Sequence, residues 1–355
     1  GAGGHGTSRK WFVVRTKDGD REVFGKTPTS NMGESFFLNL FDVYANEVRF
    51  YDYVKRMEST TVLPNGFFPT VYATKFSAFR SRFLLLLENV DRTRTSATTK
   101  ISFPELSPSV DHPLRRVLAV LDTQAQLHVE FFNRPPSCVW NKDDRPPLLQ
   151  LIAQATKKDV ISRFPDALSP NVLAEYDLFL THHDVVRKHW DSGALTLVHG
   201  DAHLGNYYFA EEFNGTDVIS TTARMYDFQC TAHEHPIRDV CYHILCSVDE
   251  TVLAQYGGDQ ELLRYYLSRF NENLKKRGGD SLRTSYYLSF NDAWVQYRLH
   301  AFWVLTAFVI SAGAGEKLFD GDKARFTVGR ISRGCERIAA GAQLRNFLRH
   351  SGVTL

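Results

Sequence analysis

A polar loop between two short apolar runs constrains the fold of this 355-residue chain more than any other feature. The segment 197–209 reads Leu-Val-His-Gly-Asp-Ala-His-Leu-Gly-Asn-Tyr-Tyr-Phe, and Met-Tyr-Asp-Phe-Gln follows at 225–229. Apolar runs bounded by Gly, Asp and Asn are typical of buried strands, so the pattern places Asp201, Asn206 and Asp227 together at strand ends. These residues supply hard oxygen ligands for Mg²⁺ and one carboxylate that accepts or orients a hydroxyl proton.

The composition indicates a globular protein and disfavours two classes of partner. Hydrophobic residues make up 43% of the chain, and the net charge of +2 gives no strong field. We therefore expect no nucleic-acid partner and no membrane partner. The near-apolar segment 301–314 is shorter than the roughly 20 residues that a bilayer crossing requires, which favours a buried helix.

Cysteine usage and the start of the sequence indicate the compartment. Five cysteines without a Cys-x-x-Cys pair are typical of reduced thiols. The chain does not open on a basic-then-apolar leader. We therefore expect a cytoplasmic protein, and the sequence leaves the oligomeric state open.

The pattern His-Gly-Asp-x-x-x-x-Asn, followed by an apolar strand ending in Asp-Phe-Gln, resembles the aminoglycoside phosphotransferase and choline kinase-like superfamily. Within it, the chain is most similar to the ecdysteroid kinase-like branch, from about residue 1 to about residue 310. The resemblance implies an α+β, two-lobed, protein-kinase-like fold. It implies a β-rich N-lobe with one helix at 1–90, a hinge at 88–90 and a mainly helical C-lobe at 91–355.

The resemblance also implies an activity. Asp201 would be the catalytic base, Asn206 and Asp227 would hold Mg²⁺, and ATP would donate a phosphoryl group to a hydroxyl of a small-molecule alcohol. A nucleotide-binding pseudokinase or scaffold without turnover is the alternative, because the family's first strand is missing ahead of the candidate phosphate loop. A protein kinase is disfavoured because the sequence lacks His-Arg-Asp and a long activation segment. The identity of the acceptor stays open.

The glycine-rich start is the candidate phosphate loop. Glycines allow backbone N–H groups to approach phosphate oxygens, which makes Gly4, Gly6, Thr7 and Ser8 candidates for nucleotide binding. The alternative is a flexible terminus. The run 11–14 reads as a strand, and 21–26 returns after a turn to form a hairpin that ends at Lys26.

Lys26 stands where the resemblance places a phosphate-binding lysine. Helical periodicity over 41–57 puts Glu47 on an apolar stripe, where a carboxylate is costly unless it is paired. We therefore predict a Lys26–Glu47 ion pair, with a boundary glutamate that reaches water as the alternative. The run 83–90 resembles the family's hinge strand, so Glu88 and Val90 would contact the adenine edge through their backbone.

Two residues are expected to support the loop rather than to react. His199 is interpreted as a brace that bonds to backbone, and Asp239, in a Pro-x-x-Asp element, resembles the family's support for the loop backbone. His128 lies on a clean helical stripe and is interpreted as a hydrogen-bonded core histidine. The Cys and His residues of 230–246 match no common zinc spacing.

The residues expected to bind the acceptor alcohol have the least specific sequence pattern. His203 is interpreted either as a contact to substrate or phosphate or as a further brace of the loop. Asp292 and Trp294, in an aromatic-rich region, are candidates for holding a cationic or bulky acceptor, with core packing as the alternative. Segment 91–109 reads as a polar connector, 169–190 as one helix, and 320–355 contains no readable motif.

Overall fold

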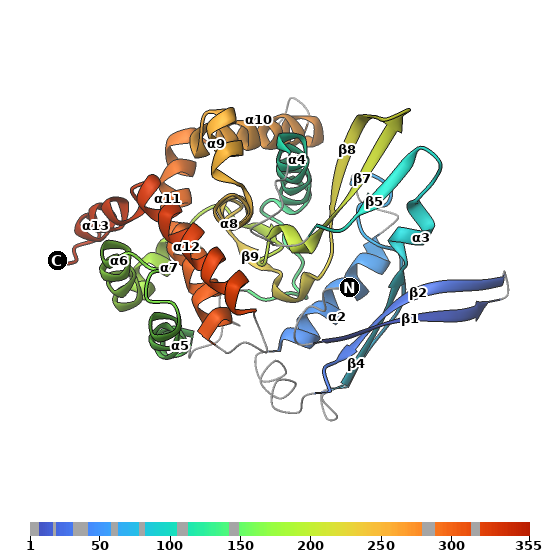
Figure 1. The fold of residues 1–355 in the computed structure, drawn as a ribbon, viewed down its shortest axis with the longest axis horizontal. Helices are drawn as coiled ribbons and strands as arrows, with labels where there is room; N and C mark the ends of the chain where they lie inside the picture. Colours follow the sequence, from blue (N-terminus) through green and yellow to red (C-terminus); the bar gives the residue numbers. More distant parts are fainter. Residues whose placement is uncertain are drawn as a thin grey trace.

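The computed structural model describes residues 7–16, 19–30, 42–57, 63–77, 82–104, 113–141, 149–278, 288–313 and 320–355. The chain has an α+β, two-lobed fold, as predicted (Figure 1). An antiparallel sheet and one long helix form one side of the molecule, and a mainly helical mass forms the other.

The small lobe is built on a four-stranded antiparallel sheet with the order β1-β2-β4-β3. Its strands are β1 (Thr7–Thr16), β2 (Gly19–Pro28), β3 (Val71–Ser77) and β4 (Arg82–Glu88). The predicted hairpin is confirmed, because β1 pairs with β2 from Thr7↔Pro28 to Thr16↔Gly19. Strand β2 then pairs with β4, and Lys26 lies opposite Leu85.

Helix α2 (Val43–Met57) packs against this sheet and connects it to the large lobe. The apolar stripe predicted for this helix is buried, including Tyr44, Tyr51 and Val54. Phe50 stacks on Phe228 with ring centroids 4.3 Å apart, so α2 also contacts the segment that follows Asp227. The packing of α2 therefore places Glu47 at the junction of the two lobes.

Segment 91–109 was wrongly predicted to be only a connector. It contains most of the short helix α3 (Val90–Arg94) and strand β5 (Thr99–Ser102). The side chain of Asn89 caps α3, and β5 pairs with β7 (Tyr207–Asn214), a partner more than 100 residues away. Long-range pairing of this kind leaves little local signal in the sequence.

Two further strand pairs frame the polar loop. Strand β7 pairs with β8 (Asp217–Met225), and β6 (Thr196–Val198) pairs with β9 (Ala232–Glu234). The loop between β6 and β7 and the turn after β8 therefore emerge side by side. Tyr226 N donates to Asn206 O at 3.1 Å and fixes this arrangement.

The large lobe is mainly helical. Its helices are α4 (Leu114–Phe131), α5 (Leu149–Arg163), α6 (Pro170–Thr181), α7 (His183–Asp191), α8 (Ile237–Ser247), α9 (Glu250–Tyr256), α10 (Asp259–Gly278), α11 (Phe290–Gly313), α12 (Gly321–Arg337) and α13 (Ala340–His350). The single helix predicted at 169–190 is interrupted at His182, which separates α6 from α7. None of the helices in the described residues is both long enough and apolar enough to cross a membrane.

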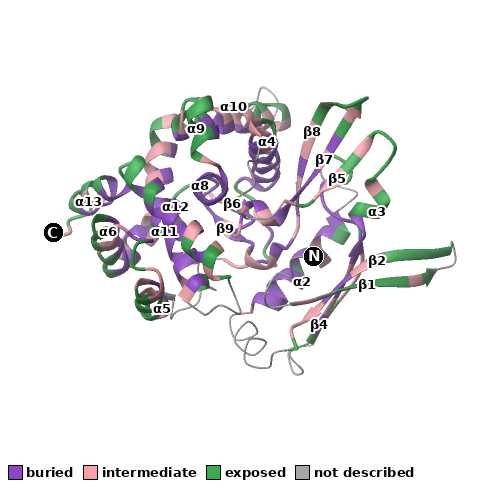
Figure 2. Ribbon diagram, viewed as in Figure 1, coloured by how far each residue is buried: buried purple, intermediate pink, exposed green. Residues whose placement is uncertain are grey.

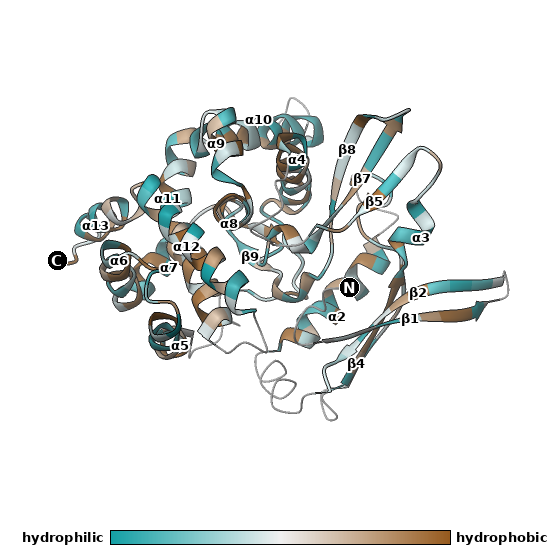
Figure 3. Cartoon of the chain, in the orientation of Figure 1, coloured by the Kyte–Doolittle hydropathy of each residue, from teal (hydrophilic) through white to brown (hydrophobic). Residues whose placement is uncertain are grey.

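Helix α8 lies at the centre of the large lobe, and all of its residues are buried (Figure 2). Helices α4, α11 and α12 pack against it. Figure 3 shows hydrophobic residues concentrated along α4 and hydrophilic residues along the outer part of β2. Helix α8 begins ten residues after Asp227, with β9 between them, and this buried helix supports the candidate site from the large lobe.

Candidate active site

The loop after β6 requires glycine at its second position. Gly200 has φ +81, and a Cβ there would lie 2.0 Å from the carbonyl oxygen of Cys230. The two backbone segments approach so closely that a side chain would displace one of them. Gly200 therefore sets the turn that delivers Asp201 to the edge of β6.

Asp201 is held as a carboxylate with a donor on each oxygen. Tyr242 donates its hydroxyl to Oδ1 at 2.8 Å, and the side-chain amide of Asn206 donates to Oδ2 at 3.0 Å. His203 Nε2 lies 3.5 Å from Oδ2. Burial alone would raise the pKa of Asp201, but His203 and the hydroxyl of Tyr242 hold that pKa well below its ordinary value. Asp201 is therefore ionised and fixed in orientation.

The side-chain amide nitrogen of Asn206 donates hydrogen bonds within the loop. Its Nδ2 donates to the backbone oxygen of Asp201 at 2.8 Å and to the carboxylate of the same residue at 3.0 Å. Because the amide is planar, its oxygen points away from this carboxylate. Asn206 thereby keeps a hard oxygen directed away from Asp201.

Asp227 lies in the left-handed region of the backbone, with φ 67 and ψ 58. Aspartate tolerates this conformation better than most residues, and such positions cluster at functional sites. Its Oδ1 accepts from Lys26 Nζ at 2.6 Å. The turn after β8 therefore aims this carboxylate at the small lobe.

The predicted Lys26–Glu47 ion pair is confirmed. Lys26 Nζ donates to both carboxylate oxygens of Glu47, at 2.8 and 2.7 Å. The side chains of Lys26 and Glu47 are 3% and 1% exposed, and that of Asp227 is 8% exposed. The alternative of a boundary glutamate that reaches water is wrong. A lysine buried between two carboxylates is the arrangement that compensates the desolvation of all three charges.

The net charge of this cluster suits a divalent cation. One ammonium, on Lys26, faces the carboxylates of Glu47 and Asp227, and Asp201 adds a third carboxylate. In their ordinary ionisation states these groups leave the cluster two charges negative. Mg²⁺ is commonly bound by one or two protein oxygens, together with phosphate oxygens and water. The oxygens of Asn206 and Asp227 therefore fit Mg²⁺ in kind.

Beneath the loop, Asp239 on α8 has the contacts predicted for it. Its carboxylate accepts from the backbone N–H groups of His199 and Gly200, at 2.6 and 3.0 Å. His199 in turn contacts the carbonyl oxygen of Tyr226 at 2.8 Å, which is the predicted backbone contact. His128 is a hydrogen-bonded core residue, as predicted, between Tyr266 OH at 2.7 Å and Asp239 at 3.2 Å.

Asn46 ties α2 to the large lobe next to Glu47. Its Nδ2 donates to the carbonyl oxygens of Gln229 and Thr231 at 3.0 and 2.9 Å. Its Oδ1 accepts from Trp140 N at 3.0 Å, and the residue is fully buried. Asn46 was not among the residues predicted from the sequence, although its position next to a glutamate on an apolar stripe is a usable signal.

The hinge candidates lie at the end of β4. Glu88 N donates to Thr70 O at 2.8 Å, so a contact from the Glu88 backbone to adenine would have to use its carbonyl oxygen. The Glu88 side chain pairs with Arg94 at 2.9 and 2.7 Å. Burial opposes ionisation of Glu88, but the hydrogen bonds from Arg94 and Thr70 lower its pKa to about 2. Val90 is buried in the first turn of α3.

The phosphate-loop candidates are only partly described. Gly4 and Gly6 lie outside the described residues. Thr7 and Ser8 lie at the start of β1 and pair with Pro28 and Thr27 at the end of β2. Lys26 lies in the same part of that hairpin, so Thr7 and Ser8 stay candidates by position.

The structure places Asp292 and Trp294 at the wrong end of α11. Phe308 on this helix lies near the loop, with its ring centroid 6.5 Å from that of His203. Trp294 is 14 residues earlier, which corresponds to roughly 21 Å along a helix. Asp292 accepts from Ser289 at the helix start, and Trp294 stacks on Tyr297. The core-packing alternative describes Trp294 better, and neither residue is near Asp201.

The Cys and His residues of 230–246 have other partners. Cys241 and Cys246 donate to the carbonyl oxygens of Tyr297 and Tyr242, at 3.2 and 2.8 Å. His233 contacts the carbonyl oxygen of Pro136 at 2.7 Å. In the part of the chain that the structure describes, no group of three or more His, Cys, Asp or Glu is arranged to hold a metal.

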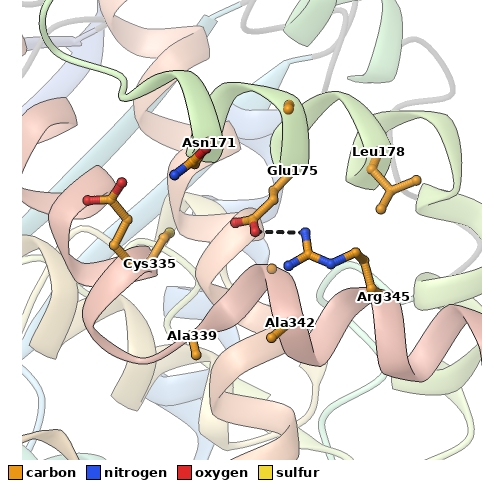
Figure 4. A pocket seen from close by; sticks show the side chains of 10 residues that line it. Asn171, Glu175, Leu178, Cys335, Ala339, Ala342 and Arg345 are labelled. Atoms are coloured by element: carbon orange, nitrogen blue, oxygen red, sulfur yellow. Dashed lines mark hydrogen bonds and ion pairs between the residues drawn. The ribbon is translucent and has the colours of Figure 1, made fainter.

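A surface pocket of about 630 Å³ lies away from this site, between α6, α12 and α13 (Figure 4). Glu175 and Arg345 form an ion pair of 2.8 Å across it, and Gly341 allows the close approach of the Glu175 side chain. None of its lining residues belongs to the cluster around Lys26 and Asp201.

Residues 155–279 match the sequence model of the ecdysteroid kinase-like family. This part of the chain includes the polar loop, Asp227 and Asp239. The resemblance carried by the loop motif is therefore confirmed there. Among curated proteins, none matches the sequence.

Solved structures of small-molecule kinases resemble the chain at low similarity. An ethanolamine kinase of Plasmodium vivax is 9% identical with a TM-score of 0.41, over 92% of this chain and 82% of that one. A choline kinase of Cryptosporidium parvum is 11% identical with a TM-score of 0.42, over 99% and 92%. A third structure, a ternary complex with streptomycin and ATP, is 15% identical with a TM-score of 0.39, over 92% and 93%.

Proposed function

We propose that this protein is an ATP- and Mg²⁺-dependent phosphotransferase that phosphorylates a hydroxyl group of a small molecule. One observation carries the proposal: Lys26, Glu47 and Asp227, from three distant segments, form a buried cluster beside the loop that holds Asp201 and Asn206. Phosphoryl transfer needs positioning and electrostatic stabilisation more than covalent chemistry from the protein. A buried cluster of one lysine and two carboxylates, next to a further carboxylate and an amide, supports a role in phosphoryl transfer.

Each residue has a role in this proposal. Asp201 orients the acceptor hydroxyl and takes its proton, and Asn206 and Asp227 hold Mg²⁺. Lys26, held by Glu47, presents its ammonium to the phosphates. Mg²⁺, when bound, neutralises charge on the phosphate oxygens. Because the pKa of Asp201 is lowered, this carboxylate orients a hydroxyl better than it removes a proton in the ground state.

The nucleotide would lie between the lobes. We place the lobe boundary at Glu88–Val90, with the N-lobe at 1–90 and the C-lobe at 91–355, and assign adenine contacts to the backbone there. Thr7 and Ser8, with Gly4 and Gly6, would cover the phosphates. His203 would face the acceptor, because its ring lies near both Asp201 and Phe308.

Arg94 strengthens the proposed boundary. Its guanidinium donates to the Glu88 carboxylate, to the carbonyl oxygen of Phe68 at 3.1 Å, and to Tyr208 OH at 2.8 Å. These contacts join the hinge, the small lobe and strand β7.

All five cysteines are free thiols, and we propose a reducing, cytoplasmic compartment on that basis.

The test is release of ADP from MgATP over a library of alcohols, with Asp201→Asn run in parallel. We expect at least one alcohol to raise the rate, and we expect the variant to lose this increase. Stabilisation of the fold by ATP with no turnover on any alcohol would favour the pseudokinase instead. Transfer by Asp201→Asn at the wild-type rate would remove Asp201 from the mechanism.

A further inference from the structure

Three residues of helix α8 form hydrogen bonds with the polar loop between β6 and β7. Asp239 accepts from the backbone of His199 and Gly200, and Ser247 Oγ accepts from Leu204 N at 2.9 Å. The third residue is Tyr242, whose hydroxyl donates to the side chain of Asp201. Because all residues of α8 are buried, the loop is attached to one of the least mobile elements of the lobe.

Tyr242 differs from the other two attachments in what it holds. Asp239 and Ser247 bond to backbone, whereas Tyr242 bonds to the carboxylate that the proposed function uses. Asp239 and Tyr242 are three residues apart, so they project from the same face of the helix. One turn of α8 therefore positions both the backbone of the loop, through Asp239, and the side chain of Asp201, through Tyr242.

The two oxygens of Asp201 are held by different side chains. Tyr242 OH lies 2.8 Å from Oδ1, and Asn206 Nδ2 lies 3.0 Å from Oδ2. Removing the first donor leaves Asn206 and His203 to hold the carboxylate through Oδ2 alone, so its orientation is less tightly defined. Small losses of alignment are costly in transfer reactions that rely on positioning.

We infer that Tyr242 is a positioning residue that sets the orientation of the Asp201 carboxylate toward the acceptor hydroxyl. This inference rests on the proposed function. It assigns no chemical step to Tyr242, which acts only through Asp201.

The environment of Tyr242 suits a fixed donor. Its side chain is 4% exposed, and its ring packs against Phe308 with centroids 5.5 Å apart. Burial and the nearby Asp201 charge raise its pKa well above the ordinary value, so the hydroxyl keeps its proton. The contact with Phe308 of α11 holds the ring so that its hydroxyl oxygen stays beside Asp201.

The chain contains a matched control for this interaction. Tyr297 on α11 is also buried, and its hydroxyl donates to the carboxylate of Asp259 at the same distance, 2.8 Å. Asp259 also pairs with Arg337 and takes no part in the proposed site. Tyr297→Phe therefore removes the same group from the same kind of buried bond, without touching Asp201.

The experiment compares Tyr242→Phe, Tyr297→Phe and the wild type by steady-state release of ADP from MgATP. Each protein is assayed with water as the acceptor and with the alcohol that gives the highest wild-type rate. We expect Tyr242→Phe to lower kcat about ten-fold or more, with the KM values for ATP and alcohol within about two-fold. We expect Tyr297→Phe to keep the wild-type kcat. A loss that came only from weaker folding would appear in both variants.

A thermal-denaturation cycle gives a second measurement that needs no turnover. Tyr242→Phe, Asp201→Asn and the double variant are melted, and we expect Tm shifts that do not add, because the two side chains share one bond. Additive shifts would overturn the inference. A wild-type kcat for Tyr242→Phe, with Asp201→Asn inactive, would overturn it and leave the proposed function standing. No turnover by the wild type would overturn both.

Discussion

Lys26 Nζ lies 2.6 Å from Asp227 Oδ1, although 201 residues separate the two positions. The same ammonium also donates to both oxygens of Glu47 on α2. Lys26 therefore joins the sheet of the small lobe, helix α2 and the turn after β8. The lysine is at once a structural link between the lobes and the group proposed to meet the phosphates.

Lys26→Met tests both roles. We expect kcat to fall roughly 100-fold or more, because a preorganised cation is lost. We also expect the free energy of unfolding to fall by about 3–5 kcal/mol, because two buried carboxylates lose their partner. Steady-state kinetics and urea denaturation measure the two effects.

A second variant separates them. Lys26→Met combined with Glu47→Gln should recover part of the stability and none of the activity, since it removes one unpaired charge without replacing the cation. Lys10→Met, at an exposed position of the same hairpin, is the control and should change neither quantity. Full activity of Lys26→Met would contradict the role given to this lysine.

Asn46→Ala tests whether the position of α2 is set by its side-chain amide. The change removes three hydrogen bonds of a fully buried side chain, and we expect a loss of roughly 2–4 kcal/mol in the free energy of unfolding. Glu47 should then be held less firmly, which raises the KM for ATP. Asn271→Ala on α10, where the amide also donates to a carbonyl oxygen, should leave that KM unchanged.

Gly200→Ala tests the close approach of the loop to Cys230. Gly200 and Gly352 have nearly the same backbone angle, with φ +81 and +82, but a Cβ at Gly352 meets nothing within 4 Å. Both variants carry the strain of a left-handed alanine, roughly 1–2 kcal/mol. Only Gly200→Ala adds a clash with backbone, so it should melt at a clearly lower temperature and lose activity. Equal Tm values would show that the loop yields to the added methyl group.

Glu88 gives a pH dependence with a defined sign. Its pKa is lowered from 4.5 to about 2 in the folded protein, so its ionised form is stabilised by folding. The contribution is complete above about pH 4.5 and is lost as the pH falls toward 2. Glu88→Gln should therefore narrow the Tm gap between pH 6 and pH 3, relative to the wild type. Glu212→Gln, at an exposed position, should leave that gap as it is.

The loop motif, the hairpin and the amphipathic helices could be predicted because each leaves a local pattern. The Lys26–Glu47 pair was predicted from the apolar stripe around Glu47 together with the family resemblance at Lys26. Glu47 was predictable since a carboxylate on an apolar stripe needs a partner. Strand β5 and helix α3 could not be predicted in this way, because β5 depends on pairing with β7 across more than 100 residues. Asp292 and Trp294 were misplaced because an aromatic stripe does not reveal which end of a 24-residue helix faces the loop.

Tyr242 was missed for a different reason. Its spacing from Asp239 puts both on one face of α8, but a tyrosine inside an apolar helix usually indicates core packing. Only the fold shows that its hydroxyl meets Asp201.

The attachment of the loop to α8 has a consequence for hydrogen exchange. The amide protons of His199, Gly200 and Leu204 are donated to side chains of a fully buried helix, so solvent reaches them only when that helix opens. The amide protons of a loop without regular secondary structure would then exchange as slowly as those of the core. Their exchange rate would measure the global opening of the large lobe.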